Sequence, residues 1–133
     1  MGQSTGSGVG RTRVLVVDDD PRVRDLLRDF LGTIGCDVDE AADGLEGVAR
    51  LAQAGYDLVV TDLVMPGPTG WDVTEAVRRR DAALPVLMLT GSATNLDADR
   101  ARALGVRILH KPVGFVEFRA AAAQALATRA GGR

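Results

Sequence analysis

Acidic, hydroxyl and amine side chains directly follow four short apolar runs of the chain. They are Asp18-Asp19-Asp20 after 14–17, Thr61-Asp62 after 58–60, Thr90-Gly91-Ser92 after 86–89, and His110-Lys111-Pro112 after 106–109. If the four runs are parallel strands of one sheet, their carboxyl ends share an edge, and these side chains meet there. Two like charges about 4 Å apart repel by about 4 kcal/mol near a protein surface, so such carboxylates oppose folding unless a cation joins them.

This set of side chains favours phosphoryl chemistry at a bound divalent ion. Hard oxygen ligands suit Mg²⁺. A metal ion and the Lys111 ammonium can neutralise the oxygens of a phosphoryl group, and an aspartate can act as the nucleophile. Polar residues at exposed strand ends are common and could account for any one of these side chains, but they account less well for the whole set.

Apolar runs alternate with helical patterns along the chain. Strands are predicted at 14–17, 36–41, 58–60, 86–89 and 106–109, and most of these runs lack the polar alternation of a half-exposed strand. The predicted buried helix faces are Val23, Leu26, Leu27, Phe30, Leu31 and Ile34; Leu45, Val48, Ala49 and Ala52; Val73, Ala76 and Val77; Leu96, Ala103 and Leu104 in a weakly amphipathic helix over 95–104; and Phe115, Phe118, Ala122 and Leu126. This order predicts an α/β fold of the doubly wound (βα)5 type, with a five-stranded parallel sheet flanked by helices on both faces.

Length and composition indicate one globular domain with short irregular ends. The chain has 133 residues, and we expect a flexible tail over 1–10, a folded domain over 11–130 and a frayed end over 131–133. The net charge of −2 gives no electrostatic case for direct binding to nucleic acid or to a membrane. The single cysteine, Cys36, excludes an internal disulfide, and no apolar run approaches the length of a membrane span. We therefore expect a cytoplasmic location.

The motifs together strongly resemble the receiver domain of two-component response regulators. The resemblance runs from about Val14 to Leu126. It rests on Val14-Leu15-Val16-Val17-Asp18-Asp19, on Thr61-Asp62-Leu63-Val64-Met65-Pro66-Gly67, on Thr90-Gly91 and on Lys111-Pro112, in this order and spacing. It implies a flavodoxin-like fold over the 11–130 domain. It also implies that the chain accepts a phosphoryl group from a sensor histidine kinase or a histidine phosphotransfer protein.

The resemblance also implies a role for each residue of the acidic set. Asp62 resembles the phosphoacceptor, and Asp19 resembles the direct Mg²⁺ ligand, with Asp18 helping through water. The side chain of Asp62 and the backbone carbonyl of Val64 complete the implied metal site.

On the same resemblance, Thr90 would bond a phosphoryl oxygen, and Lys111 would pair with the phosphoryl group. Gly91 fits the small residue that leaves this group accessible, and Val64 and Ser92 occupy positions that tune the lifetime of the phosphate. The Lys111–Pro112 bond is cis in the family.

One residue departs from the family pattern. Three residues before the lysine the family usually has Tyr or Phe, the ring that moves inward on activation, whereas this chain has Ile108. Because Ile108 has no polar tip, we expect it to pack inward or beneath the helix over 95–104 in both states, and we expect that helix to move. Single residues with a simple interpretation are Asp20 (solvated), Trp71 (half-exposed packing), His110 (strand-end surface) and Cys36 (packing).

Three other functions fit parts of the sequence. A haloacid-dehalogenase-type phosphatase would use Asp18-x-Asp20, but it needs a late acidic pair, and Glu117 is the only acidic residue after Lys111. A flavin-binding module of the same fold would need a phosphate cradle where the chain has Asp18-Asp19-Asp20-Pro21, which would repel phosphate. A degenerate receiver would act only as a docking module.

We expect a phosphoacceptor that takes up and slowly loses a phosphoryl group, rather than a dedicated enzyme. It would be a stand-alone regulator or a piece of a larger protein such as a hybrid kinase. Its downstream partner would be a protein target or an output domain missing from this chain.

Overall fold

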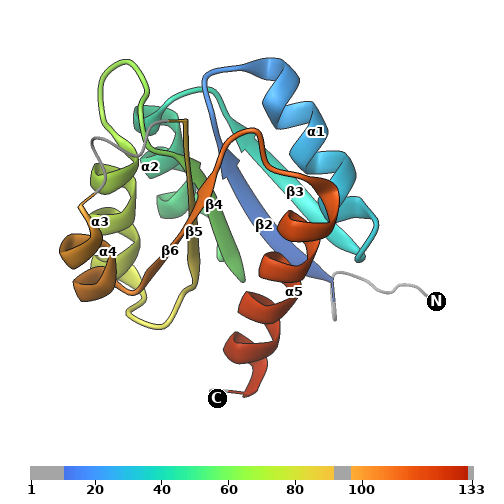
Figure 1. Cartoon of the computed structure of the whole chain (residues 1–133). Coiled ribbons are helices and arrows are strands. Elements are labelled where there is room, and N and C mark those ends of the chain that lie inside the picture. Colours follow the sequence, from blue (N-terminus) through green and yellow to red (C-terminus); the bar gives the residue numbers. More distant parts are fainter. Residues whose placement is uncertain (1–10, 92–96, 132–133) are drawn as a thin grey trace.

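Within the residues that the computed structural model describes, five parallel strands and five helices alternate along the chain (Figure 1). The described residues are 11–91 and 97–131, so the predicted tail over 1–10, the last two residues, Ser92 and Leu96 lie outside them. The elements are β2 (Thr12–Val17), α1 (Pro21–Gly32), β3 (Cys36–Ala41), α2 (Gly44–Gln53), β4 (Leu58–Asp62), α3 (Gly70–Arg80), β5 (Val86–Thr90), α4 (Ala98–Leu104), β6 (Val106–His110) and α5 (Phe115–Gly131). Among the described residues, no helix has the length and apolar character needed to cross a bilayer.

The strand order is β3-β2-β4-β5-β6, and every neighbouring pair is parallel. The chain moves from β2 outward to β3 and then returns to the other side of β2, so the order reverses between β2 and β4. In doubly wound sheets, the crevice at such a reversal, beyond the carboxyl ends of the strands, is where sites form. The predicted flavodoxin-like α/β fold is confirmed.

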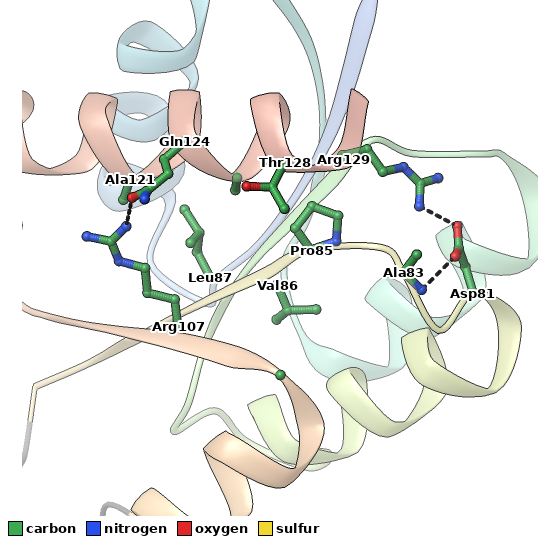
Figure 2. Close-up of a pocket in the computed structure, with 12 residues that line it drawn as sticks. Asp81, Ala83, Pro85, Val86, Leu87, Arg107, Ala121, Gln124, Thr128 and Arg129 are labelled. Atoms are coloured by element: carbon green, nitrogen blue, oxygen red, sulfur yellow. Dashed lines mark hydrogen bonds and ion pairs between the residues drawn. The ribbon is translucent and has the colours of Figure 1, made fainter. Parts of the chain in front are cut away.

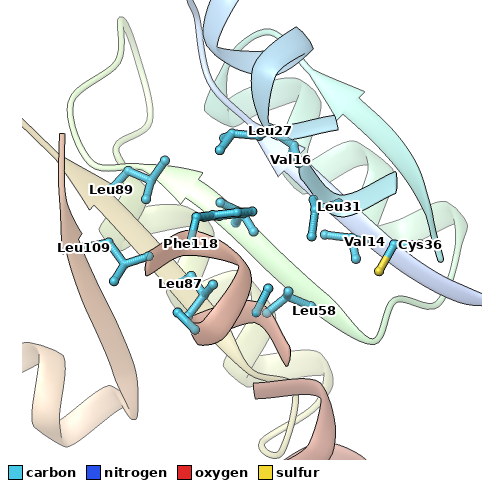
Figure 3. Close-up of a cluster of buried hydrophobic side chains, with 13 residues drawn as sticks. Val14, Val16, Leu27, Leu31, Cys36, Leu58, Leu87, Leu89, Leu109 and Phe118 are labelled. Carbon is cyan, nitrogen blue, oxygen red and sulfur yellow. The ribbon is translucent and has the colours of Figure 1, made fainter. Parts of the chain in front are cut away.

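Each face of the sheet is covered by its own set of helices. Figure 1 shows α1 and α5 on one side of the sheet and α2, α3 and α4 on the other. Alternate residues of β2 point to the two sides, so that Val14 and Val16 join the α1/α5 core while Leu15 and Val17 join the α2/α3 core. Phe118 of α5 is fully buried at the centre of the first core, among side chains of the sheet (Figure 3).

The predicted buried face of α1 is largely confirmed. Leu27 and Leu31 are fully buried, and Val23, Phe30 and Ile34 pack partly against the same core. Leu26 was wrongly placed in this face, because 45% of the residue is exposed at the margin of the apolar stripe.

The predicted buried face of α2 is wrong except at Val48, which is partly buried against the core. Leu45 is 71% exposed, and Ala49 and Ala52 are exposed as well, whereas Gly44, Gly47 and Leu51 are buried. A Cβ atom on Gly47 would lie 2.9 Å from a methyl carbon of Val17 on β2. The helix therefore turns Gly47 to the sheet and Gly44 to Pro68, where a Cβ atom would lie 2.5 Å from the Pro68 carbonyl oxygen, and the larger Leu45 faces outward.

The other helix faces are confirmed at most positions. In α3, Val73, Ala76 and Val77 are buried. In α5, Phe118 and Ala122 are buried and Leu126 is partly buried, whereas Phe115 is 38% exposed, contrary to the prediction. In α4 the buried residue is Ala101, whereas Ala103 is exposed, contrary to the prediction. Leu104, which is predicted to face inward, does so and packs partly against the cluster that contains Ala101.

Candidate functional site

The carboxyl ends of β2 and β4 bring three carboxylates together, as the sequence predicts. Asp62 ends β4, and Asp18 and Asp19 directly follow β2, which pairs with β4 through Val17 and Thr61. Oxygen atoms of the three side chains lie within 4.8 Å of one another. Asp18 and Asp62 are buried, with exposed fractions of 1% and 6%, while Asp19 is exposed. The cluster therefore has a buried floor and one carboxylate at its mouth.

Lys111 reaches this cluster from the segment that directly follows the edge strand β6. Its Nζ lies 3.1 Å from Oδ2 of Asp18 and 3.3 Å from Oδ1 of Asp62. Its backbone N–H donates to the carbonyl of Thr90 at 2.8 Å, which ties the segment after β6 to the end of β5. The Lys111–Pro112 bond is cis, as the resemblance implies. Lys111 is the only lysine in the sequence, so the one compact ammonium of the chain lies between the two buried carboxylates.

The charges of the site shift the pKa values of its groups. Burial raises the pKa of Asp62, the negative charge of Asp18 raises it further, and Lys111 offsets part of this rise. Burial alone would lower the pKa of Lys111, but Asp18 and Asp62 together raise it above its ordinary value. Three carboxylates against one ammonium leave an excess of negative charge at close range. The chemistry of this donor set fits a small divalent cation with oxygen ligands such as Mg²⁺.

Asp18 is held through each of its polar groups. Its backbone N–H donates to the carbonyl of Ala41 at 3.1 Å, and its own carbonyl accepts from Nη1 of Arg24 at 2.7 Å. Its Oδ1 accepts from the N–H of Asp20 at 2.9 Å, and its Oδ2 contacts Lys111. The sequence did not single out Arg24, which lies three residues before Leu27 and seven before Leu31, at the margin of the apolar stripe of α1. Its side chain is only 17% exposed.

Gly70 is a second residue of the site that the sequence did not single out. It begins α3, and its N–H donates to the carbonyl of Leu63 at 2.9 Å. A Cβ atom at this position would lie 2.5 Å from the carbonyl oxygen of Asp62. Only glycine therefore allows α3 to start against the end of β4. A glycine directly after the cap Thr69 is the one local signal of this approach.

The remaining predicted site residues end β4 and β5 or follow these strands in the sequence. Thr90 ends β5 beside β4 and is 1% exposed. Val64 lies two residues after Asp62 with its side chain largely exposed, and the space beside Gly91 is open. Ser92 lies outside the described residues. The roles of Thr90 and of the Val64 carbonyl stay predictions.

Two interpretations of single residues need correction. Asp20 is half-buried rather than solvated, because it caps α1 and its side chain accepts from the N–H of Arg22 at 2.9 Å. Trp71 is 8% exposed rather than half-exposed, since α4 covers it and the guanidinium of Arg100 lies 4.9 Å from its ring centroid.

The remaining single-residue interpretations agree with the structure. His110 is exposed at the end of β6, and Cys36 is buried in the core. Ile108, which replaces the usual aromatic residue, is half-buried and packs with Leu104 of α4 against the cluster formed by Leu63, Trp71, Met88 and Ala101. This is the position beneath the fourth helix that the sequence predicts.

A groove separate from the acidic cluster lies at the opposite end of the sheet. It has a volume of about 710 Å³ and runs between α5 and the amino-terminal ends of β5 and β6 (Figure 2). The ion pair of Arg129 with Asp81, at 2.8 Å, closes one end, and Arg107 bonds Gln124 across the other. None of the predicted site residues lines it, so the groove is separate from the acidic cluster.

The fold and the site define a class of protein. A flavodoxin-like sheet with an acidic pocket and a lysine at its switch point is the architecture of a signalling receiver domain. The family model of the response regulator receiver domain matches residues 14–123, and the chain belongs to this family. Receiver domains are phosphoacceptors rather than dedicated enzymes, and they partner with histidine kinases. Membership in this family excludes two of the three other functions that fit parts of the sequence, the haloacid-dehalogenase-type phosphatase and the flavin-binding module.

Known relatives agree with this assignment. Sensor protein EvgS of Escherichia coli is 35% identical over 101 residues, which are 75% of this chain and 8% of that protein. Transcriptional regulatory protein ResD of Bacillus subtilis is 44% identical over 79 residues, 59% of this chain and 32% of that protein. The chain therefore spans about a third or less of the length of these two relatives. Response regulator TrrA of Thermotoga maritima, solved in complex with Mg²⁺-BeF, is 29% identical with a TM-score of 0.78, over 86% of this chain and 98% of that chain.

Proposed function

We propose that Asp62 accepts a phosphoryl group from a phosphohistidine of a sensor histidine kinase or a histidine phosphotransfer protein. The phosphorylated surface would then be recognised by a downstream protein target or an output domain, in the cytoplasm. The observation that carries the proposal is the position of Asp62, a buried carboxylate within 4.8 Å of two others and 3.3 Å from the only lysine of the chain.

The three carboxylates fit Mg²⁺ as the cofactor. Asp19 and Asp62 would supply side-chain oxygens, Val64 would supply its backbone carbonyl, and Asp18 would act through water, because both of its oxygens already accept hydrogen bonds. When bound, the ion supplies positive charge to the phosphoryl oxygens.

The residues of the chain would divide the rest of the chemistry. An oxygen of Asp62 forms the new bond to phosphorus while the bond from phosphorus to the donor histidine nitrogen breaks, and the imidazole leaves with that electron pair. Burial raises the pKa of Asp62, which makes its carboxylate a stronger nucleophile. Lys111 and the Thr90 hydroxyl would then bind phosphoryl oxygens. Later attack of water on the phosphorus would release phosphate and restore the Asp62 carboxylate.

The test is phosphorylation by a small donor. With Mg²⁺ and acetyl phosphate, intact-mass spectrometry should show one added phosphoryl group on the wild-type protein and none on Asp62→Asn, which is nearly isosteric. Asp57→Asn is the matched control, because Asp57 precedes β4, at the other end of that strand, and accepts from the N–H of Arg13 at 3.0 Å. Labelling of Asp62→Asn at the wild-type rate would overturn the assignment. A wild type that is never labelled would instead favour the degenerate docking receiver.

A further inference from the structure

Arg24 connects the acidic cluster to two other elements. Its Nη1 donates to the backbone carbonyl of Asp18 at 2.7 Å, and its Nε donates to Oε1 of Glu40 on β3 at 3.1 Å. Its backbone N–H continues α1 by donating to the carbonyl of Asp20 at 3.1 Å. The side chain is 17% exposed, and that of Glu40 is 26% exposed. One guanidinium thus fixes the turn between β2 and α1 against the edge strand.

The bond to the Asp18 carbonyl determines where Asp19 lies. The carbonyl of Asp18 and the N–H of Asp19 belong to one planar peptide group, so fixing the carbonyl oxygen fixes the direction in which the chain enters Asp19. The Asp19 carboxylate itself is exposed, and no hydrogen bond or ion pair holds it within the part of the chain that the structure describes. Its placement near Asp62 therefore depends on its backbone.

We infer that Arg24 is a positioning residue for the Mg²⁺ site. It holds the Asp18–Asp19 peptide so that the Asp19 carboxylate stays within reach of a metal ion shared with Asp62. The inference rests on the proposed function, since it concerns the same ion. Loss of a residue that supports a metal ligand without touching the metal itself typically weakens metal binding about 10- to 100-fold.

The positioning role and simple electrostatics predict opposite signs. Arg24 is a cation beside an anionic site, so removal of its charge alone would make Mg²⁺ bind more tightly. Loss of positioning would make Mg²⁺ bind more weakly. Arg28 provides the matched control, because it binds Oε2 of the same Glu40 at 2.7 Å and also pairs with Asp25. Arg28 thus shares the carboxylate partner and the charge of Arg24, and it does not contact Asp18 among the described residues.

The experiment compares Mg²⁺ binding by the wild type, Arg24→Met, Arg24→Lys and Arg28→Met. Isothermal titration with MgCl₂ gives the dissociation constant. Acetyl phosphate labelling at a series of Mg²⁺ concentrations gives two further quantities, the Mg²⁺ concentration at half-saturation and the maximal labelling rate. We expect Arg24→Met to weaken Mg²⁺ binding about tenfold, which corresponds to about 1.4 kcal/mol, and to raise half-saturation by the same factor at an unchanged maximal rate. Arg24→Lys keeps the charge but lacks the fork that spans both partners, so it should restore part of the affinity. Arg28→Met should stay within about twofold of the wild type.

The possible outcomes separate this inference from the proposed function. Equal or tighter Mg²⁺ binding by Arg24→Met would overturn the inference, as would equal weakening by Arg28→Met. If Arg24→Met does not fold, the comparison of Arg24→Lys with the wild type gives the same decision. If the wild type itself binds no Mg²⁺, or if Asp19→Ala binds it equally well, the proposed metal site fails and the inference fails with it.

Discussion

Lys111 provides the most direct test of how the acidic site is stabilised without metal. At an effective dielectric constant of about 20, its ammonium attracts Asp18 by about 5.4 kcal/mol across 3.1 Å and Asp62 by about 5.0 kcal/mol across 3.3 Å. Most of this attraction is cancelled, because removing an ammonium and a carboxylate from water costs several kcal/mol each. Lys111→Met should therefore lower the free energy of unfolding by much less than the summed attraction.

The expected loss follows from what the substitution leaves behind. Two buried carboxylates would face each other with their oxygens within 4.8 Å, and breaking a buried ion pair in this way typically costs about 3–5 kcal/mol. Because the Lys111 side chain is 26% exposed and water can reach the site, we expect the lower end, about 3 kcal/mol. For a domain of this size the melting temperature should fall by roughly 10 °C.

The pH dependence of this loss has a defined sign. Lys111 lowers the pKa of Asp62 against burial and Asp18, so Lys111→Met should raise that pKa further. A carboxyl group whose folded-state pKa exceeds its unfolded value favours folding below the unfolded value, and this contribution is lost as the pH rises through the folded-state pKa. The stability deficit of Lys111→Met should therefore be full near neutral pH and shrink as the pH falls toward the ordinary aspartate value of 3.8.

The assay is urea unfolding in EDTA, followed by the fluorescence of the single tryptophan, Trp71, across this pH range. Arg102→Met is the control, since the Arg102–Asp99 pair is 71% and 95% exposed and should contribute less than about 1 kcal/mol. The reasoning is refuted if Lys111→Met loses no more stability than Arg102→Met, or if its deficit is unchanged in acid. Added Mg²⁺ should stabilise Lys111→Met more than the wild type, because no ammonium then competes with the metal ion.

Three further predictions concern the metal, the core and the switch. Asp19→Ala should remove most of the rise in melting temperature that millimolar Mg²⁺ produces in the wild type, and an equal rise in both proteins would place the metal site elsewhere. Gly47→Val should destabilise the protein by about 1–3 kcal/mol in urea unfolding, because a Cβ atom there meets β2 at 2.9 Å, whereas Gly55→Ala has open space and should change little. Addition of beryllofluoride, a phosphoryl mimic, should shift the NMR signals of α4 while the Ile108 rotamer stays unchanged, since Ala101 is the single buried residue among those of α4. A rotamer flip at Ile108 beside a static α4 would contradict this prediction.

The order of the elements could be predicted from the sequence because it depends on local patterns. Short apolar runs such as 14–17 and 86–89 have no polar alternation, and this pattern is typical of strands buried on both faces. The same patterns assigned the wrong buried face to α2, because they depend on large apolar side chains such as Leu45. The close contacts of this helix are made instead by two glycines that have no side chain to obstruct them: Gly47 lies against β2, and Gly44 lies against Pro68.

The composition of the acidic site was also determined by the sequence. Parallel strands share one carboxyl edge, so residues that end or directly follow β2 and β4 meet there, as Asp18, Asp19 and Asp62 do. The tertiary structure decided how the site is held. Arg24 lies at the margin of the apolar stripe of α1, and only the packing of α1 beside β3 buries its guanidinium between the Asp18 carbonyl and Glu40. A hydrogen bond to a backbone carbonyl leaves no mark in the identity of the residue that accepts it, so this contact could be found only in three dimensions.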